Sequence, residues 1–155
     1  MSRLKMGIEE AATLLTEAYK YYLMSRQLLE KNDFSVSVQA SQSCIEISVK
    51  SIFSLVDLHY PPLSDPTKRI ELIIKKFKLP KRFSLITEGV QRLIFLSKLS
   101  KTFHDFSMYG YFDVGTSKIF QKRDAEILTG YALEAWNICS RIDAAVRSKQ
   151  IKIWE

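Results

Sequence analysis

The chain has 155 residues, of which 46% are hydrophobic and 26% charged, and its formal net charge is +6. This length and composition exclude a disordered or fibrous protein and predict one domain, numbered 1–155, with its core over about 8–147. No apolar run approaches the roughly 20 residues that span a bilayer. No apolar stretch precedes Glu9 either, so a signal peptide is not expected and we predict a cytoplasmic protein. The positive charge favours an anionic partner.

The first predicted helix runs from about 7 to 31, where apolar residues recur at helical spacing and polar residues line the opposite side. Asn32 and Asp33 interrupt this pattern, and Asp33 is a candidate N-cap for the next helix. Because the connection is so short, we expect the two helices to be antiparallel neighbours.

The second predicted helix, about 34–58, is apolar on two well-separated sides. A helix of this kind is enclosed by several partners, which predicts a place at the centre of the bundle. Its seven serines would allow neighbouring helices to approach closely. A narrow polar line remains, Gln42, Glu46 and Lys50, whose spacing of four residues puts them on one side of the helix. This line is either a solvated ion pair or, given its enclosed helix, partly buried or facing a second subunit.

The rest of the chain predicts three more helices. A Pro-rich connection at 59–67 ends in Asp65-Pro66, a start signal for a short helix that carries Ile70 and Phe77 and ends at Leu79-Pro80. A fourth helix is expected over about 84–105, and a last one over about 124–147. Between them, 106–123 loses periodicity and is predicted to be an ordered loop. The sum is an all-α, up-and-down antiparallel bundle of about five helices.

Several chemistries are not indicated. Cys44 and Cys139 lie far apart in sequence on apolar helix faces, which predicts two buried, reduced thiols. There is no Gly-rich phosphate loop, no nucleophile elbow and no set of residues spaced for a metal, so we expect no metal and no cofactor.

The segment 41–53, SQSCIEISVKSIF, resembles the second-helix signature of HEPN domains (higher eukaryotes and prokaryotes nucleotide-binding), in which a Gln is followed by Glu-x-x-x-Lys. The turn at 31–34, the Met108-Tyr109-Gly110 segment and the KRDAE start of the last helix are also similar to that family. The resemblance covers roughly residues 8–145 and implies a bundle of four to five helices, usually a homodimer, like the substrate-binding subunits of nucleotidyltransferases.

The resemblance also implies where catalysis would lie. Active family members are metal-independent ribonucleases that carry Arg, then four to six residues, then His, near the end of the fourth helix. His104 stands near that place, but the nearest preceding arginine is Arg92, with eleven residues between them. Lys98 and Lys101 are closer, yet lysine lacks the bidentate fork of arginine.

The leading hypothesis is therefore a non-catalytic HEPN-like module, related to nucleotides or RNA and acting with a minimal nucleotidyltransferase partner, as in toxin–antitoxin pairs. One alternative is a divergent ribonuclease that uses His104 with Lys98 or Lys101. Another is a stand-alone basic RNA-binding module, because a basic run could neutralise phosphates, although it could also be a solvated helix face. This run consists of Lys68, Arg69, Lys75, Lys76, Lys78, Lys81 and Arg82.

Overall fold

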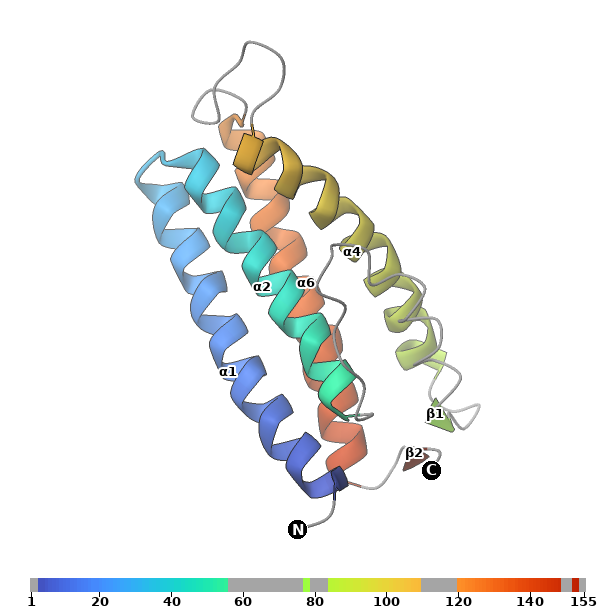
Figure 1. Cartoon of the computed structure of the whole chain (residues 1–155). Coiled ribbons are helices and arrows are strands. Elements are labelled where there is room, and N and C mark those ends of the chain that lie inside the picture. The colour runs from blue at the N-terminus through green and yellow to red at the C-terminus, as the bar shows by residue number, and fades with distance from the viewer. Residues whose placement is uncertain (1–2, 56–76, 79–83, 110–119, 149–151, 154–155) are drawn as a thin grey trace.

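The computed structural model describes residues 3–55, 77–78, 84–109, 120–148 and 152–153. Within these ranges it contains four long helices and one pair of short antiparallel strands (Figure 1). The helices are α1 (Arg3–Glu30), α2 (Phe34–Leu55), α4 (Ser84–Tyr109) and α6 (Lys122–Arg147); the strands are β1 (Phe77–Lys78) and β2 (Lys152–Ile153). The helices run alternately up and down, which confirms the all-α antiparallel bundle.

The count of about five helices is not matched in the described ranges, which hold four. Most of the predicted third helix lies outside them. Its last predicted residues, Phe77 and Lys78, do not form a helix but pair as β1 with Ile153 and Lys152. The prediction is wrong for these two residues because the chain end, to which no structure was assigned from sequence, supplies a strand partner.

The break between α1 and α2 has the hydrogen bonds of a Schellman motif. Asn32 adopts a φ of 61°, the left-handed conformation that asparagine tolerates better than most residues. The amide of Asp33 donates to the carbonyl of Leu28 at 2.9 Å, and the amide of Asn32 donates to that of Leu29 at 3.0 Å. The Asp33 carbonyl then accepts the Ser37 amide at 3.0 Å, which places Asp33 at the N-cap position of α2.

Helix α2 lies at the centre of the bundle, as its two apolar sides predicted. It contacts α1, α4 and α6, and in Figure 1 it lies between α1 and α4. Val38 and Cys44 are fully inaccessible, and Ile45 and Val49 are 1% exposed. Burial of such side chains is the main term that holds the helices together, at about 1.5–3 kcal/mol for each large one.

Four buried hydroxyls connect α1, α2 and α6, and we call Ser25, Ser37, Ser41 and Thr129 the hydroxyl cluster. The Oγ of Ser25 lies 2.6 Å from that of Ser41, 2.7 Å from Oγ1 of Thr129 and 3.2 Å from Oγ of Ser37. The Oγ of Ser37 also donates to the carbonyl of Ser25 at 2.8 Å. Ser37 and Ser41 of α2 therefore do more than allow close approach, because their hydroxyls have hydrogen-bond partners on α1 and α6.

Both cysteines are buried and neither forms a disulfide, as their positions on apolar helix faces predicted. Burial raises the pKa of the Cys44 thiol to about 12, and burial also raises the pKa of Cys139 well above its usual value. At neutral pH both are protonated, and a thiol is a poor nucleophile.

Helices α4 and α6 are both longer than predicted. Helix α4 continues to Tyr109, and α6 begins at Lys122, so the predicted loop is wrong at 106–109 and 122–123. The start of α6 is fixed by the Gln121 amide, which donates to Oδ2 of Asp124 at 2.8 Å. Among the described helices, none is long and apolar enough to cross a membrane.

Candidate functional site

The predicted polar line is divided by the packing of α2. Gln42 is 3% exposed, and its Nε2 donates to the carbonyl of Ser100 on α4 at 3.2 Å. Glu46 and Lys50, one and two turns further along, are exposed. Gln42 is thus the residue of this line that bonds to α4, whereas the charged residues Glu46 and Lys50 face outward.

The bond from Gln42 reaches the turn of α4 that carries His104. Ser100 stands four residues before His104, so in an α-helix its carbonyl is the acceptor for the His104 amide. The carbonyl of Ser100 therefore accepts two hydrogen bonds, one from the His104 amide and one from Nε2 of Gln42. The second bond links this turn of α4 to the central helix α2. The backbone of His104 lies within α4; its side chain is outside the described part of the chain.

The position of Arg92 on α4 separates it from His104. The helix is unbroken from Ser84 to Tyr109, and twelve residues at 1.5 Å each place the two about 18 Å apart along its axis. The same twelve residues turn the backbone about 120° beyond three full turns, so the two positions lie on different sides of the helix axis. The two positions are therefore farther apart along α4 than the four to six intervening residues that the resemblance implies for active members.

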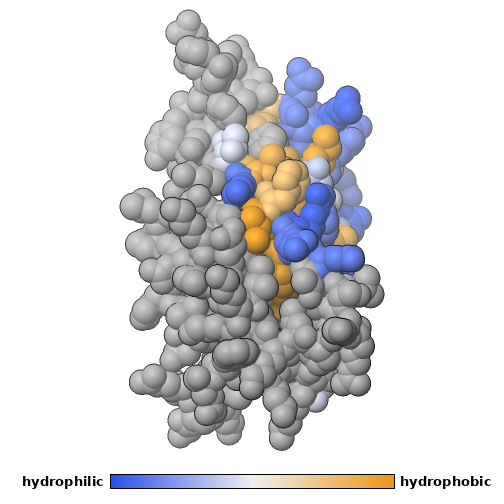
Figure 2. All heavy atoms as spheres, turned by 90° about the vertical axis from the view of Figure 1, so that its right-hand side faces the viewer, coloured by the Kyte–Doolittle hydropathy of each residue, from blue (hydrophilic) through white to orange (hydrophobic). Residues whose placement is uncertain are grey.

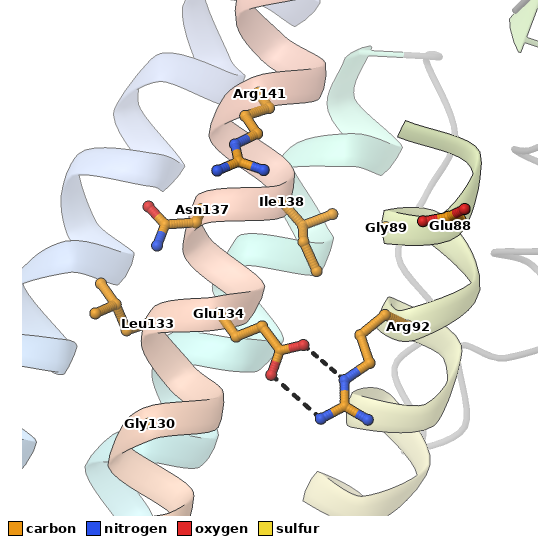
Figure 3. Close-up of a pocket in the computed structure, with 9 residues that line it drawn as sticks. All are labelled: Glu88, Gly89, Arg92, Gly130, Leu133, Glu134, Asn137, Ile138 and Arg141. Atoms are coloured by element: carbon orange, nitrogen blue, oxygen red, sulfur yellow. Dashed lines mark hydrogen bonds and ion pairs between the residues drawn. The ribbon is translucent and has the colours of Figure 1, made fainter. Parts of the chain in front are cut away.

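Arg92 is instead bound to α6. Its Nε donates to Oε1 of Glu134 at 2.6 Å and its second terminal nitrogen to Oε2 at 3.3 Å, a bidentate ion pair (Figure 3). The guanidinium carbon lies 4.7 Å from the ring centre of Phe95 and 5.3 Å from that of Tyr131. The hydrogen bond with Glu134 raises the pKa of Arg92 further above its ordinary value.

This ion pair lies in a groove of about 470 Å³ between α4 and α6 (Figure 3). Gly89 lets the two helices approach there, because a Cβ at this position would lie 3.1 Å from Cγ2 of Ile138. The groove carries balanced charge and is lined by Glu88, Gly89, Arg92, Gly130, Leu133, Glu134, Asn137, Ile138 and Arg141.

Apolar side chains are exposed on the same side of the molecule. Phe95 of α4 is 45% exposed, and Ile127 of α6 is 40% exposed. The ring of Phe95 meets that of Tyr131 edge to face, with centres 6.3 Å apart. Figure 2, turned to show the α4 side, has a strip of hydrophobic atoms with hydrophilic ones on both sides. This site could not be predicted from the sequence, because its contacts, Arg92 with Glu134 and Phe95 with Tyr131, join residues about forty positions apart.

Other predicted residues are only partly described. Met108 and Tyr109 form the end of α4, and Lys98 is exposed on that helix. Gly110 and the basic run lie outside the described residues, except for the backbone of Lys78 in β1. Among the side chains that the structure describes, no three His, Cys, Asp or Glu residues gather closely enough to hold a metal ion.

One buried carboxylate lies away from this groove. Asp143 is 8% exposed, and its Oδ2 accepts from Nε of Arg147 at 2.8 Å, while Oδ1 is buried with no hydrogen-bond donor among the described residues. Burial raises the pKa of Asp143, and Arg147 offsets part of that rise. Arg147 also donates to the carbonyl of Ile8 at 3.3 Å, so the pair joins α6 to the start of α1.

A family model described as HEPN domain matches residues 11–142, most of the chain. The chain belongs to the HEPN domain family. The match runs from α1 to α6 and confirms the resemblance seen in the second helix. No curated protein and no solved structure matches the chain significantly.

Proposed function

We propose that this HEPN domain is a non-catalytic binding module for nucleotides or RNA, and that it acts as a homodimer with a separately encoded minimal nucleotidyltransferase. Membership of the HEPN family supports the relation to nucleotides or RNA. The net charge of +6 supports an anionic ligand, because basic proteins attract phosphates.

The proposal that the domain is non-catalytic is supported by the geometry of α4. Active family members need Arg and His within about two turns of one helix, whereas Arg92 and His104 are about 18 Å apart here. Arg92 is also engaged at two of its nitrogens by Glu134. It would have to leave that ion pair before it could bind a scissile phosphate.

One observation favours a second candidate, a divergent ribonuclease at His104. Gln42 holds the Ser100 carbonyl, which fixes the turn on which His104 lies. Lys98 is exposed and precedes His104 by six residues, about 9 Å along the helix. A cation at that distance could contact the same RNA backbone, although not in the bidentate manner of arginine.

RNA binding tests the first proposal. We expect the fluorescence anisotropy of a labelled single-stranded RNA to rise on binding, with an affinity that falls as salt is raised from about 50 to about 200 mM. If four phosphates are neutralised, a slope of about −0.7 per phosphate predicts about a 50-fold loss over that range. Binding that is insensitive to salt would contradict the proposal.

Matched variants locate the contact. The double change Lys75→Glu with Lys76→Glu should weaken binding well beyond the change Lys20→Glu with Lys31→Glu, which alters the net charge by the same amount. Lys20 and Lys31 are exposed on and just after α1. Equal losses in the two double variants would mean that overall charge, and not the basic run, attracts the RNA.

Co-purification tests the nucleotidyltransferase partner. A minimal nucleotidyltransferase encoded beside this chain should elute with it from a sizing column at micromolar concentration. If the two proteins elute separately under those conditions, the partner is not a nucleotidyltransferase of that kind, whatever the RNA result.

A further inference from the structure

The strand pair β1–β2 brings together two basic segments that are far apart in the sequence. Phe77 of β1 pairs with Ile153 of β2, and Lys78 pairs with Lys152, in antiparallel register. The helices α4 and α6 both lie between these two strands along the chain. Figure 1 shows the strand pair at the end of the bundle where α4 begins and α6 ends. The fold therefore adds a lysine from the chain end to the basic run around β1.

This register places two like charges directly opposite each other. Opposite residues of an antiparallel pair share one face of the ladder, with Cβ atoms about 4.5–5.5 Å apart. Because successive residues alternate between faces, Phe77 and Ile153 share one face, and Lys78 and Lys152 share the other. Like charges at opposite positions destabilise a strand pair. An anion between the two lysines would remove this repulsion and stabilise the ladder.

The sequence around both strands contains few acids that could serve as this anion. No acidic residue lies between Glu71 and Glu88, a stretch that contains five basic residues. After Asp143, which is paired with Arg147, the sequence contains one acidic residue, Glu155. A basic stretch of this length matches the backbone of a nucleic acid, which presents one phosphate after another, better than it matches a single nucleotide.

We propose that the β1–β2 pair is a phosphate-binding site for single-stranded RNA, in which one backbone phosphate lies between Lys78 and Lys152. This inference rests on the proposed RNA-binding function and adds a place on the chain where the RNA is held. The phosphate accepts hydrogen bonds from both ammonium groups and cancels their mutual repulsion. Binding of RNA and pairing of the two strands therefore stabilise each other.

Charge reversal at Lys152 tests the site in anisotropy titrations with a labelled single-stranded RNA. Lys152→Glu puts a carboxylate opposite Lys78, in the place of the phosphate. We expect the affinity at about 0.1 M salt to fall about 5-fold or more, since one lost phosphate contact lowers the salt slope by about 0.7. Lys31→Glu, exposed just after α1, changes the net charge equally and should lose less than about 2-fold. Lys152→Arg keeps the charge and should bind as the wild type does.

Hydrogen exchange of the two strands, followed by mass spectrometry, measures the ladder itself. In the wild type, RNA should slow amide exchange in the peptides that contain 77–78 and 152–153. Without RNA, the same peptides should exchange more slowly in Lys152→Glu than in the wild type, because a Glu–Lys pair replaces two like charges. A lysine with a purely structural role would give the opposite result, since its replacement would speed the exchange.

The outcomes separate this inference from the proposed function. If the wild type binds RNA but Lys152→Glu loses no more affinity than Lys31→Glu, the inference is wrong and the proposed function stands. The same holds if RNA leaves the exchange of both strands unchanged. A wild type that binds no RNA contradicts the proposed function and the inference together. ATP that binds as tightly as the RNA, with the same dependence on Lys152, would indicate a nucleotide site and overturn RNA as the ligand.

Discussion

At the scale of single residues, the hydroxyl cluster is the feature with the clearest energetic consequence. Ser25 is its hub, because its Oγ reaches the hydroxyls of Ser41 and Thr129 and lies close to Ser37. All four residues are buried, so a hydroxyl that loses its partner has no water to replace it. The number of serines in α2 could be read from the sequence, but their partners in α1 and α6 could not.

Ser25→Ala should therefore destabilise the fold by about 1–3 kcal/mol, the cost of leaving buried hydroxyls unsatisfied. Ser43→Ala on α2 is the matched control, since Ser43 is only half-buried, and we expect a change within about 0.5 kcal/mol. Urea unfolding at 25 °C measures both. Equal stability of the two variants would show that the cluster contributes nothing beyond packing.

Gln42 shows how much of the candidate site the sequence could predict. Gln42 belongs to the family signature, and its position on an enclosed helix made burial one of the two alternatives that the sequence predicted for the polar line. Its acceptor, the Ser100 carbonyl, is 58 residues away and follows only from the packing of α4 on α2. Arg92 and Glu134 could not be paired from sequence for the same reason, because nothing local links residues on α4 and α6.

At the scale of elements, α4 and its link to α2 are decisive. The end of α4 was predicted too early because the apolar pattern weakens after about residue 105, yet a helix can continue without an apolar face. The start of α6 was predicted two residues late because Asp124, taken as its first residue, contacts the Gln121 amide before it. The unbroken α4 is what separates Arg92 from His104.

Gln42→Leu should loosen the turn of α4 that contains His104. The loss of one hydrogen bond costs about 0.5–1.5 kcal/mol, so the fold should persist. We expect faster amide exchange around 100–105 and unchanged exchange in α1, measured by mass spectrometry after hydrogen–deuterium exchange. Gln27→Leu, at an exposed position of α1, is the control. Unchanged exchange around 100–105 would mean that Gln42 does not hold this turn.

At the scale of the whole molecule, the bundle could be predicted because helical periodicity persists over most of the chain. Helix α2 was placed at the centre from its two apolar sides, and the packing agrees. The strand pair β1–β2 could not be predicted, since two residues on each side carry no periodicity. The family itself was visible in the order of several short motifs, and the match over 11–142 confirms it.

The central claim is that this HEPN domain binds without cleaving, and one incubation tests it. Purified protein is mixed with end-labelled single-stranded RNA in EDTA, and samples are run on native and denaturing gels. We predict a shifted band on the native gel and intact RNA on the denaturing gel, for the wild type and for His104→Ala alike. Cleavage by the wild type that disappears in His104→Ala would contradict the claim and establish a ribonuclease.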